Sequence, residues 1–322
     1  MTTKSGVFVL KALGIIFIYL VSFSAVASEE IMFEGYYKIT ASDKPIGYTV
    51  QRYTYNSKSQ QFTSKYYVYA KSPAGQVTES LTAVADNQFH PVSYKYTAVV
   101  GKALSSIDAQ FKKQKQKQGW LMTYTAANGQ QNQSFQKSIS SDVFLSTFQV
   151  YLMLQKGLKP ETKLNFSAIS EEDGEVQPGE ALVKIEPGFE GKGIYRVLTK
   201  FKGIMSIANV NAKGEVIIAQ SPVQKIQQTL VSVPAEATNG FPFDQKAIRY
   251  VFGDIPRGKV NQLAINKEKS NASANTAIPS GGGAPGSPAP TSPTANGMSS
   301  DGSGQGIKIN PPTTGSGSSQ GQ

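Results

Sequence analysis

Short runs of alternating residues, separated by turn residues, fill most of this chain and limit it to a β-rich fold. Tyr67 and Tyr69 fall on one face of such a run, while Tyr66 and Val68 fall on the other. The breaks between runs carry turn chemistry, of which Asn128-Gly129 is the strongest hairpin signal. The segments expected as strands are 31–40, 46–55, 62–70, 76–85, 92–100, 104–113, 120–126, 131–139, 163–169, 181–185, 193–202, 204–211, 215–219 and 223–233. This spacing predicts an all-β class with one buried helix: an antiparallel curved sheet, an open barrel or a sandwich.

Two segments interrupt the strand pattern. After Ser141-Asp142, apolar residues run from 143 to 154 and end at Gly157. Their helical spacing predicts a buried helix near 142–156 that plugs or covers a sheet. Residues 241–252 fit either a short helix or a closing strand, and the sequence leaves both open.

The beginning of the chain has the pattern of an export signal. Lys4 and Lys11 precede an apolar run that ends in Ala25-Val26-Ala27. The run is roughly 15 residues long, shorter than the ~20 that a helix needs to cross a bilayer. We therefore expect a signal peptide at 1–27, cleaved after Ala27, and a periplasmic or secreted protein.

The mature chain is expected to have one domain and a tail. Residues 28–269 carry the strand pattern, and residues 270–322 are rich in Gly, Ser and Pro. Such a composition cannot bury enough apolar surface to fold, so the tail is expected to be disordered. Within it, Ile307-Lys308-Ile309 is either an added strand for a partner or a chance apolar pair.

Composition excludes several kinds of chemistry. The chain has no cysteine, which removes disulfides, thiol nucleophiles, thiolate metal sites and a lipidated N-terminal cysteine. A single histidine, His90, rules out a His-rich metal centre, and its position before Pro91 in a break between strands favours a structural role. No catalytic residue, metal site or cofactor is predicted. The formal net charge of +10 favours anionic partners or serves solubility, and export makes nucleic acid an unexpected partner.

Two charged runs have competing interpretations. Lysines alternate with glutamines where two predicted strands are connected. This run is either an anion-binding or membrane-binding hairpin or a solvated hairpin tip. These lysines are Lys112, Lys113, Lys115 and Lys117. The acidic run from Glu171 to Glu175 is interpreted as a hairpin turn, because it lacks the spacing of a calcium-binding loop.

Tyrosines are concentrated in the first half of the chain. They would line a concave sheet and hold a lipid, glycan or peptide, since tyrosine combines apolar area with a polar tip. The alternative is that aromatic residues simply favour strands. The candidate ligand-binding residues are Tyr37, Tyr48, Tyr67, Tyr69, Tyr94 and Tyr96.

Five short motifs resemble known bacterial sequences. They are Gly35-Tyr36, Lys44-Pro45-Ile46-Gly47-Tyr48, Pro91-Val92-Ser93-Tyr94-Lys95, the apolar segment 143–154, and Ala212-Lys213-Gly214-Glu215. The chain resembles bacterial periplasmic β-rich domains of unknown function and is similar to the leader domains found before transglutaminase-like modules. The resemblance implies a curved antiparallel sheet or open barrel around a helix, and it brings no catalytic residues.

These observations favour a non-catalytic exported envelope protein. Its curved sheet would bind an apolar or amphipathic ligand, such as a lipid or a glycan, or an envelope protein partner. One alternative is a structural or adaptor protein tethered through its tail. A more remote alternative is a glycan hydrolase that uses two carboxyl groups ~5–10 Å apart.

Overall fold

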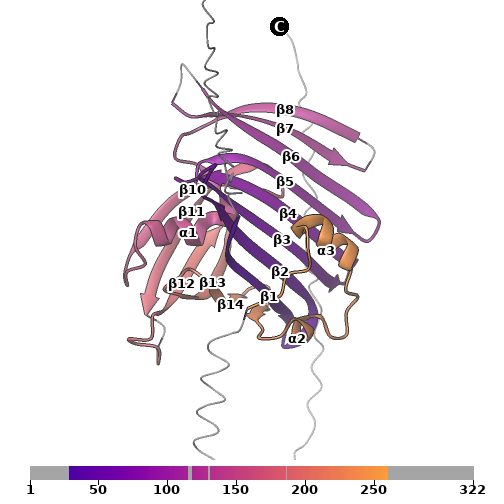
Figure 1. Cartoon of the computed structure of the whole chain (residues 1–322), viewed down its shortest axis with the longest axis vertical. Helices are drawn as coiled ribbons and strands as arrows, with labels where there is room; N and C mark the ends of the chain where they lie inside the picture. The colour runs from indigo at the N-terminus through magenta and orange to yellow at the C-terminus, as the bar shows by residue number, and fades with distance from the viewer. Residues whose placement is uncertain (1–28, 115–117, 130, 186, 260–322) are drawn as a thin grey trace, which may run out of the picture.

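The computed structural model describes residues 29–114, 118–129, 131–185 and 187–259 (Figure 1). The predicted signal peptide, the tail, Lys115 and Lys117 therefore lie outside the described residues. In the described part, fifteen strands form one sheet in the order β8-β7-β6-β5-β4-β3-β2-β1-β15-β14-β13-β12-β11-β10-β9. Strand pairs are antiparallel except for β9 and β10. The predicted β class and open, curved antiparallel sheet are confirmed.

The first half of the sheet is a continuous meander of long strands. It contains β1 (Glu30–Ala41), β2 (Lys44–Asn56), β3 (Gln61–Ser72), β4 (Gly75–Asp86), β5 (Pro91–Val100), β6 (Ala103–Lys113), β7 (Trp120–Asn128) and β8 (Gln131–Ile139). The second half contains β9 (Phe144–Leu145), β10 (Lys163–Ser170), β11 (Glu175–Ile185), β12 (Ile194–Phe201), β13 (Ile204–Asn211), β14 (Val216–Ser221) and β15 (Ile226–Leu230).

The first and last strands join the two halves. β1 pairs with β15, placing Tyr37 opposite Leu230, and it also pairs with β2, placing Tyr37 opposite Thr49. A strongly twisted sheet of more than ~10 strands must curl. Here the two halves turn against each other around this junction, so that β10–β14 lie beside the face of β1–β5 (Figure 1).

The predicted helix at 142–156 is wrong over its first part. Phe144 and Leu145 form β9, which pairs in parallel with Ala168 and Ile169 of β10. The 3-10 helix η1 (Ser146–Phe148) and the short α1 (Gln149–Gln155) follow, and neither has a side-chain N-cap at its own start. Pairing with β10 gives the backbone of β9 hydrogen-bond partners that a helix would otherwise supply. The predicted burial is confirmed for Phe148 and Tyr151, which lie in the largest hydrophobic core cluster.

The uncertain segment at 241–252 contains a helix. α3 (Gln245–Phe252) begins at Asp244, whose side chain accepts a hydrogen bond from the Ala247 N–H at 2.9 Å. It ends at Gly253, which adopts the left-handed conformation typical of a helix C-terminus. With α2 (Pro234–Thr238), it covers one face of β1–β4 (Figure 1).

Both faces of the first half of the sheet are covered by other elements. We call the face of β1–β8 that packs on η1 and α1 the inner face, and the face under α2 and α3 the outer face. Alternating residues divide between them: Tyr53 contacts Thr147 on the inner face, while Tyr48 contacts Pro242 on the outer face. No helix in the described part of the chain is long and apolar enough to cross a membrane.

Candidate functional site

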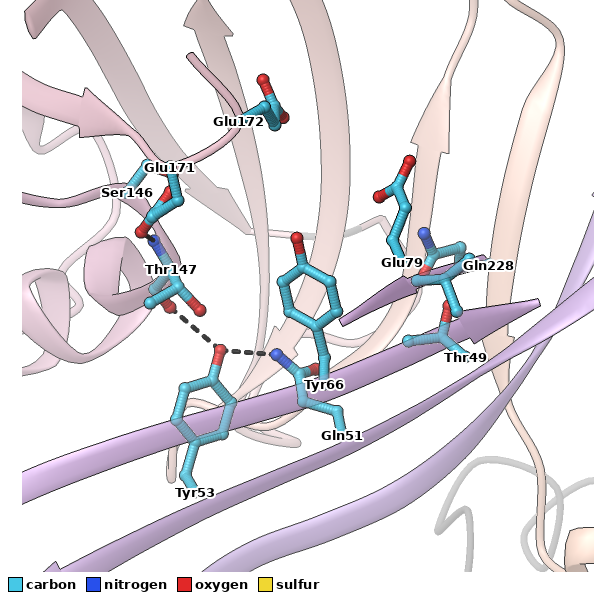
Figure 2. A pocket seen from close by; sticks show the side chains of 11 residues that line it. Thr49, Gln51, Tyr53, Tyr66, Glu79, Ser146, Thr147, Glu171, Glu172 and Gln228 are labelled. Carbon is cyan, nitrogen blue, oxygen red and sulfur yellow. Dashed lines mark hydrogen bonds between the residues drawn. The ribbon is translucent and has the colours of Figure 1, made fainter. Parts of the chain in front are cut away.

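A cavity of about 340 Å³ lies on the inner face (Figure 2). Strands β2, β3 and β4 form its floor, the β9–η1 junction and the β10–β11 turn form one side, and β15 contributes to the other. The lining residues are Thr49, Gln51, Tyr53, Tyr66, Val68, Glu79, Ser146, Thr147, Glu171, Glu172 and Gln228. Segments far apart in the sequence meet here because β15 returns to β1 and the β10–β11 turn folds over the inner face.

One side of the cavity is fixed by hydrogen bonds. Glu171 is 5% exposed, and its carboxyl accepts from the Ser146 hydroxyl at 2.5 Å and from the Thr147 N–H at 3.1 Å. The Tyr53 hydroxyl donates to the Thr147 carbonyl at 2.9 Å and accepts from Gln51 Nε2 at 2.6 Å. These polar groups are occupied by one another, so this side acts as a rigid frame.

The opposite side presents polar side chains that have no hydrogen-bond partner among residues 29–114, 118–129, 131–185 and 187–259. Thr49 is 6% exposed, and its buried hydroxyl has no hydrogen-bond partner in the part of the chain that the structure describes. The side chains of Glu79 and Gln228 lie next to Thr49, and Tyr66 stands between them and the Glu171 side (Figure 2). Among the described residues, no hydrogen bond or ion pair engages the carboxyl of Glu79. A buried hydroxyl without a partner costs about 1–3 kcal/mol, so such a group needs an explanation.

Burial shifts the titration of both carboxyls toward neutral pH. Desolvation, with a smaller contribution from nearby Glu172, raises the pKa of Glu79 to about 7. Desolvation also raises the pKa of Glu171 to about 7, against the lowering effect of its hydrogen bonds from Ser146 and Thr147. Burial and the Glu79 carboxyl raise the pKa of the Tyr66 hydroxyl well above its usual value.

None of the described residues that line the cavity has a basic side chain. Lys202, which is not among the lining residues, makes ion pairs with Glu172 at 2.6 Å and with Asp173 at 2.8 Å. Two carboxylates that share one lysine leave a net negative charge beside the cavity, and ionisation of Glu79 adds to it. In the described residues, no group of three or more Asp, Glu or His side chains stands close enough to hold a metal ion.

The acidic run is a hairpin turn, as predicted. It links β10 to β11, where Gly174 N donates to Ser170 O at 2.8 Å and Glu175 N donates to the Asp173 carboxylate at 2.9 Å. β11 begins at Glu175 rather than near Ala181, because residues 175–180 pair with β10 directly after this turn. The turn places Glu171 and Glu172 in the cavity lining, a consequence that the sequence did not indicate.

The six candidate tyrosines do not lie on one wall. Tyr37, Tyr94 and Tyr96 belong to the inner face, while Tyr48, Tyr67 and Tyr69 lie on the outer face under α3. All six are at most 5% exposed, and none lines the inner cavity. Tyr67 and Tyr69 line a second cavity of about 610 Å³ between the outer face and α3. Ligand contact by these tyrosines stays a prediction.

The structure places the remaining candidates away from the cavity. Lys112 and Lys113 are exposed at the end of β6, where Lys113 pairs with Trp120 of β7. Anion binding by this hairpin stays a prediction. His90 lies against Asp86, with Nδ1 and Oδ2 2.9 Å apart, and its ring is 5.4 Å from that of Trp120.

Sequence reasoning missed Thr49, Glu79 and Gln228. Each occupies an ordinary position in an alternating strand, so no local pattern separates it from a solvated residue. Tyr53 and Tyr66 had a visible signal, since both belong to the tyrosine-rich segment, but the sequence did not show which face of β2 and β3 would be enclosed.

Comparison with known proteins yields structural likeness only. No protein-family model matches the chain, and no curated protein matches it. One similar solved structure is a β-barrel-like protein of a domain of unknown function, DUF1849, from Brucella abortus: the TM-score is 0.43 at 12% identity, over 62% of this chain and 95% of that one. Another is a DUF1089 family protein from Pseudomonas aeruginosa: the TM-score is 0.33 at 11% identity, over 55% of this chain and 90% of that one. The predicted likeness to leader domains of transglutaminase-like modules stays a prediction. What is found is similarity in structure to bacterial DUF1849 and DUF1089 proteins.

Proposed function

We propose that this is an exported, non-catalytic binding protein that holds an amphipathic ligand on the inner face of its sheet. The observation that carries the proposal is the unpaired side of the inner cavity, where the buried Thr49 hydroxyl lies beside Glu79 and Gln228. A ligand that hydrogen-bonds there would remove the cost of an unsatisfied buried group. The rings of Tyr53 and Tyr66 and the side chain of Val68 offer it apolar contact.

The export part of the proposal comes from the N-terminal sequence. Lys4, Lys11 and the small residues at 25–27 fit a cleaved signal, which supports a periplasmic or secreted location. In that setting, envelope lipids, glycans and envelope proteins are the available partners.

A second candidate, carboxylate-based glycan hydrolysis, is favoured by one observation. Glu79 and Glu171 line the same cavity, and burial raises the pKa of each to about 7. Glycoside hydrolysis, however, needs one protonated acid and one ionised carboxylate with a free oxygen. Both oxygens of Glu171 are occupied by Ser146 and Thr147, and the pKa values of the two carboxyls are not pushed apart. Binding is therefore the better supported function.

Native mass spectrometry of protein purified from its own cell envelope tests the proposal. We expect the wild-type protein to carry a small molecule and the isosteric Thr49→Val variant to carry less of it. Removing an unpaired buried hydroxyl should leave the empty variant at least as stable as the wild type, which separates ligand loss from misfolding. Thr78→Val, on the outer face, is the matched control.

Three outcomes would contradict the proposal. Protein free of any small molecule, together with a stoichiometric protein partner, would favour the adaptor role. Equal ligand occupancy in wild type and Thr49→Val would show that the inner cavity is not the site. Release of sugar from a glycan by the wild type, abolished in Glu79→Gln, would favour the hydrolase.

A further inference from the structure

The charges around the inner cavity restrict the kind of polar group that it can accept. Among the described residues, three carboxyl groups line it, those of Glu79, Glu171 and Glu172, and no lysine, arginine or histidine does. Lys202 pairs with Glu172 and Asp173, which leaves these three groups with a net negative charge, and hydrogen bonds occupy Glu171. Glu79 is left as the carboxyl whose counter-charge the described residues do not supply.

Resting on the proposed function, we infer that the ligand's polar head is a protonated amine, held by Glu79, Thr49 and Gln228. These three side chains come from β4, β2 and β15 and cluster on the same side of the cavity (Figure 2). They offer a carboxylate, a hydroxyl oxygen and an amide oxygen, which match the three N–H donors of a primary ammonium. The Thr49 hydroxyl, buried and unpaired, is the acceptor that most requires such a donor.

The aromatic lining fits the same ligand. Tyr66 stands beside Glu79 in the cavity (Figure 2). A cation near the face of a tyrosine ring gains about 0.5–2 kcal/mol, more when water is excluded. A neutral hydroxyl head would have neither this cation–π attraction nor an ionic attraction to the Glu79 carboxylate. An anionic head would be repelled by Glu79 and Glu172.

The groups that face Glu79 set how binding depends on pH. Tyr66 on β3, Tyr96 on β5 and Glu172 of the β10–β11 turn interact electrostatically with Glu79, and Glu171 lines the same cavity. Glu79 also contributes to the lining of the second cavity, together with Lys95, Asp244 and Lys246. Burial raises the pKa of both Glu79 and Glu171 to about 7, and Glu171 is enclosed by its hydrogen bonds with Ser146 and Thr147. A cation binds the ionised form of Glu79, so binding below neutral pH must release the proton that Glu79 carries.

The size of the cavity limits the ligand. About 340 Å³ lies near the lower end of the range for small-molecule sites, which suits an ammonium head with a short alkyl chain. Octylamine, 1-octanol and octanoate therefore form a matched probe set. They share one tail and differ only in the head, which is cationic, neutral or anionic at neutral pH.

Isothermal titration of the full chain with these three probes tests the inference. At pH 8 we expect octylamine to bind at least tenfold more tightly than 1-octanol, and octanoate to bind most weakly. Below pH 7 the affinity for octylamine should fall about tenfold per pH unit, because Glu79 becomes protonated while the amine stays charged. Glu79→Gln should lower octylamine affinity at pH 8 at least tenfold and remove the pH dependence, leaving 1-octanol unaffected. Glu236→Gln, an exposed residue of α2, removes the same charge elsewhere and should change nothing.

The outcomes separate the inference from the proposed function. Equal binding of octylamine and 1-octanol, with loss of both in a cavity variant such as Tyr66→Ala, overturns the amine head and keeps the binding site. Binding of none of the three probes contradicts both. Octylamine binding that Glu79→Gln leaves intact, in a variant whose circular dichroism matches the wild type, also overturns the inference.

Discussion

The carboxyl of Glu171 accepts a hydrogen bond from the backbone N–H of Thr147 at 3.1 Å. Thr147 is in the first turn of η1, and Leu145, the residue before that helix, provides no side-chain cap. Glu171 also accepts from the Ser146 hydroxyl at 2.5 Å. A residue 24 positions later in the chain thus satisfies donors that helices usually pair with a local cap. The same contact holds the β10–β11 turn against the inner cavity.

Glu171→Ala should lower the free energy of unfolding by about 2–4 kcal/mol, because it leaves two buried donors without an acceptor. Glu171→Gln should cost less, since its amide oxygen still accepts from Thr147. Urea unfolding at pH 6 measures both variants. If Glu171→Ala has the same free energy of unfolding as the wild type, then water or a neighbouring group replaces the carboxyl as the hydrogen-bond acceptor.

Stability should fall as the pH rises from about 4.5 to about 8. Glu79 and Glu171 have a pKa of about 7 in the folded protein, raised from the ordinary glutamate pKa of 4.5, so the folded state binds more protons in this window. The fully buried Glu171 should contribute about 3 kcal/mol, and the half-buried Glu79 less. Below about pH 4 the opposite trend begins, because Asp173 and Asp254 have lowered pKa values.

Urea unfolding at half-unit pH steps from 4.5 to 8.5 measures this profile. The Glu79→Gln and Glu171→Gln double variant should show a nearly flat profile across the same window. A wild-type free energy of unfolding that rises between pH 5 and 8 would contradict the assigned shifts.

Arg52→Met should destabilise the protein by about 3 kcal/mol, because removing one member of a buried ion pair leaves the other uncompensated. The Arg52 side chain is 8% exposed and lies 2.7 Å from both Glu34 and Asp254. Asp254 is 60% exposed, so Asp254→Asn should cost about 1 kcal/mol or less. Arg52 also donates to the Phe252 carbonyl at 3.3 Å, which attaches the end of α3 to β2.

Hydrogen exchange provides the specific readout for Arg52. In Arg52→Met, the exchange rate of the α3 amides should increase over its wild-type value. The exchange rate of amides in β10–β13, which lie elsewhere in the sheet, should increase much less. Uniform acceleration across both regions would indicate a global rather than a local role.

Gly47→Ala should cost about 3 kcal/mol or more. A Cβ at Gly47 would stand 1.9 Å from the backbone oxygen of Tyr69, and the paired β3 backbone cannot move without breaking the ladder. Gly203 is the matched control: its φ is +74°, and no atom of the described residues lies within 4 Å of an added Cβ. Gly203→Ala should therefore cost only about 1–2 kcal/mol, from the left-handed backbone alone. Melting temperatures measure both, and equal losses would contradict the close approach at Gly47.

Most strands could be predicted because their signals are local. The Asn128-Gly129 turn joins β7 to β8 as expected, with Asn128 opposite Gln131. The helix prediction for 142–156 was wrong at its start because the first apolar residues, Phe144 and Leu145, pair with β10, about two dozen residues away. Apolar spacing reports that a residue is buried, and it does not report whether a neighbouring strand will supply its hydrogen bonds.

By itself, the amino-acid sequence determined the β class, most strand boundaries and the absence of cysteine chemistry, because alternation, turn residues and composition are properties of neighbouring residues. Only the tertiary structure decided which face of β2–β4 would be enclosed, and that Thr49, Glu79 and Gln228 would meet. The physical reason is that β1 pairs with β15 and the β10–β11 turn closes over the inner face. The β1–β15 pairing joins residues as far apart as Tyr37 and Leu230, and the turn residue Glu171 binds Thr147, 24 positions before it. No sequence periodicity extends over such separations.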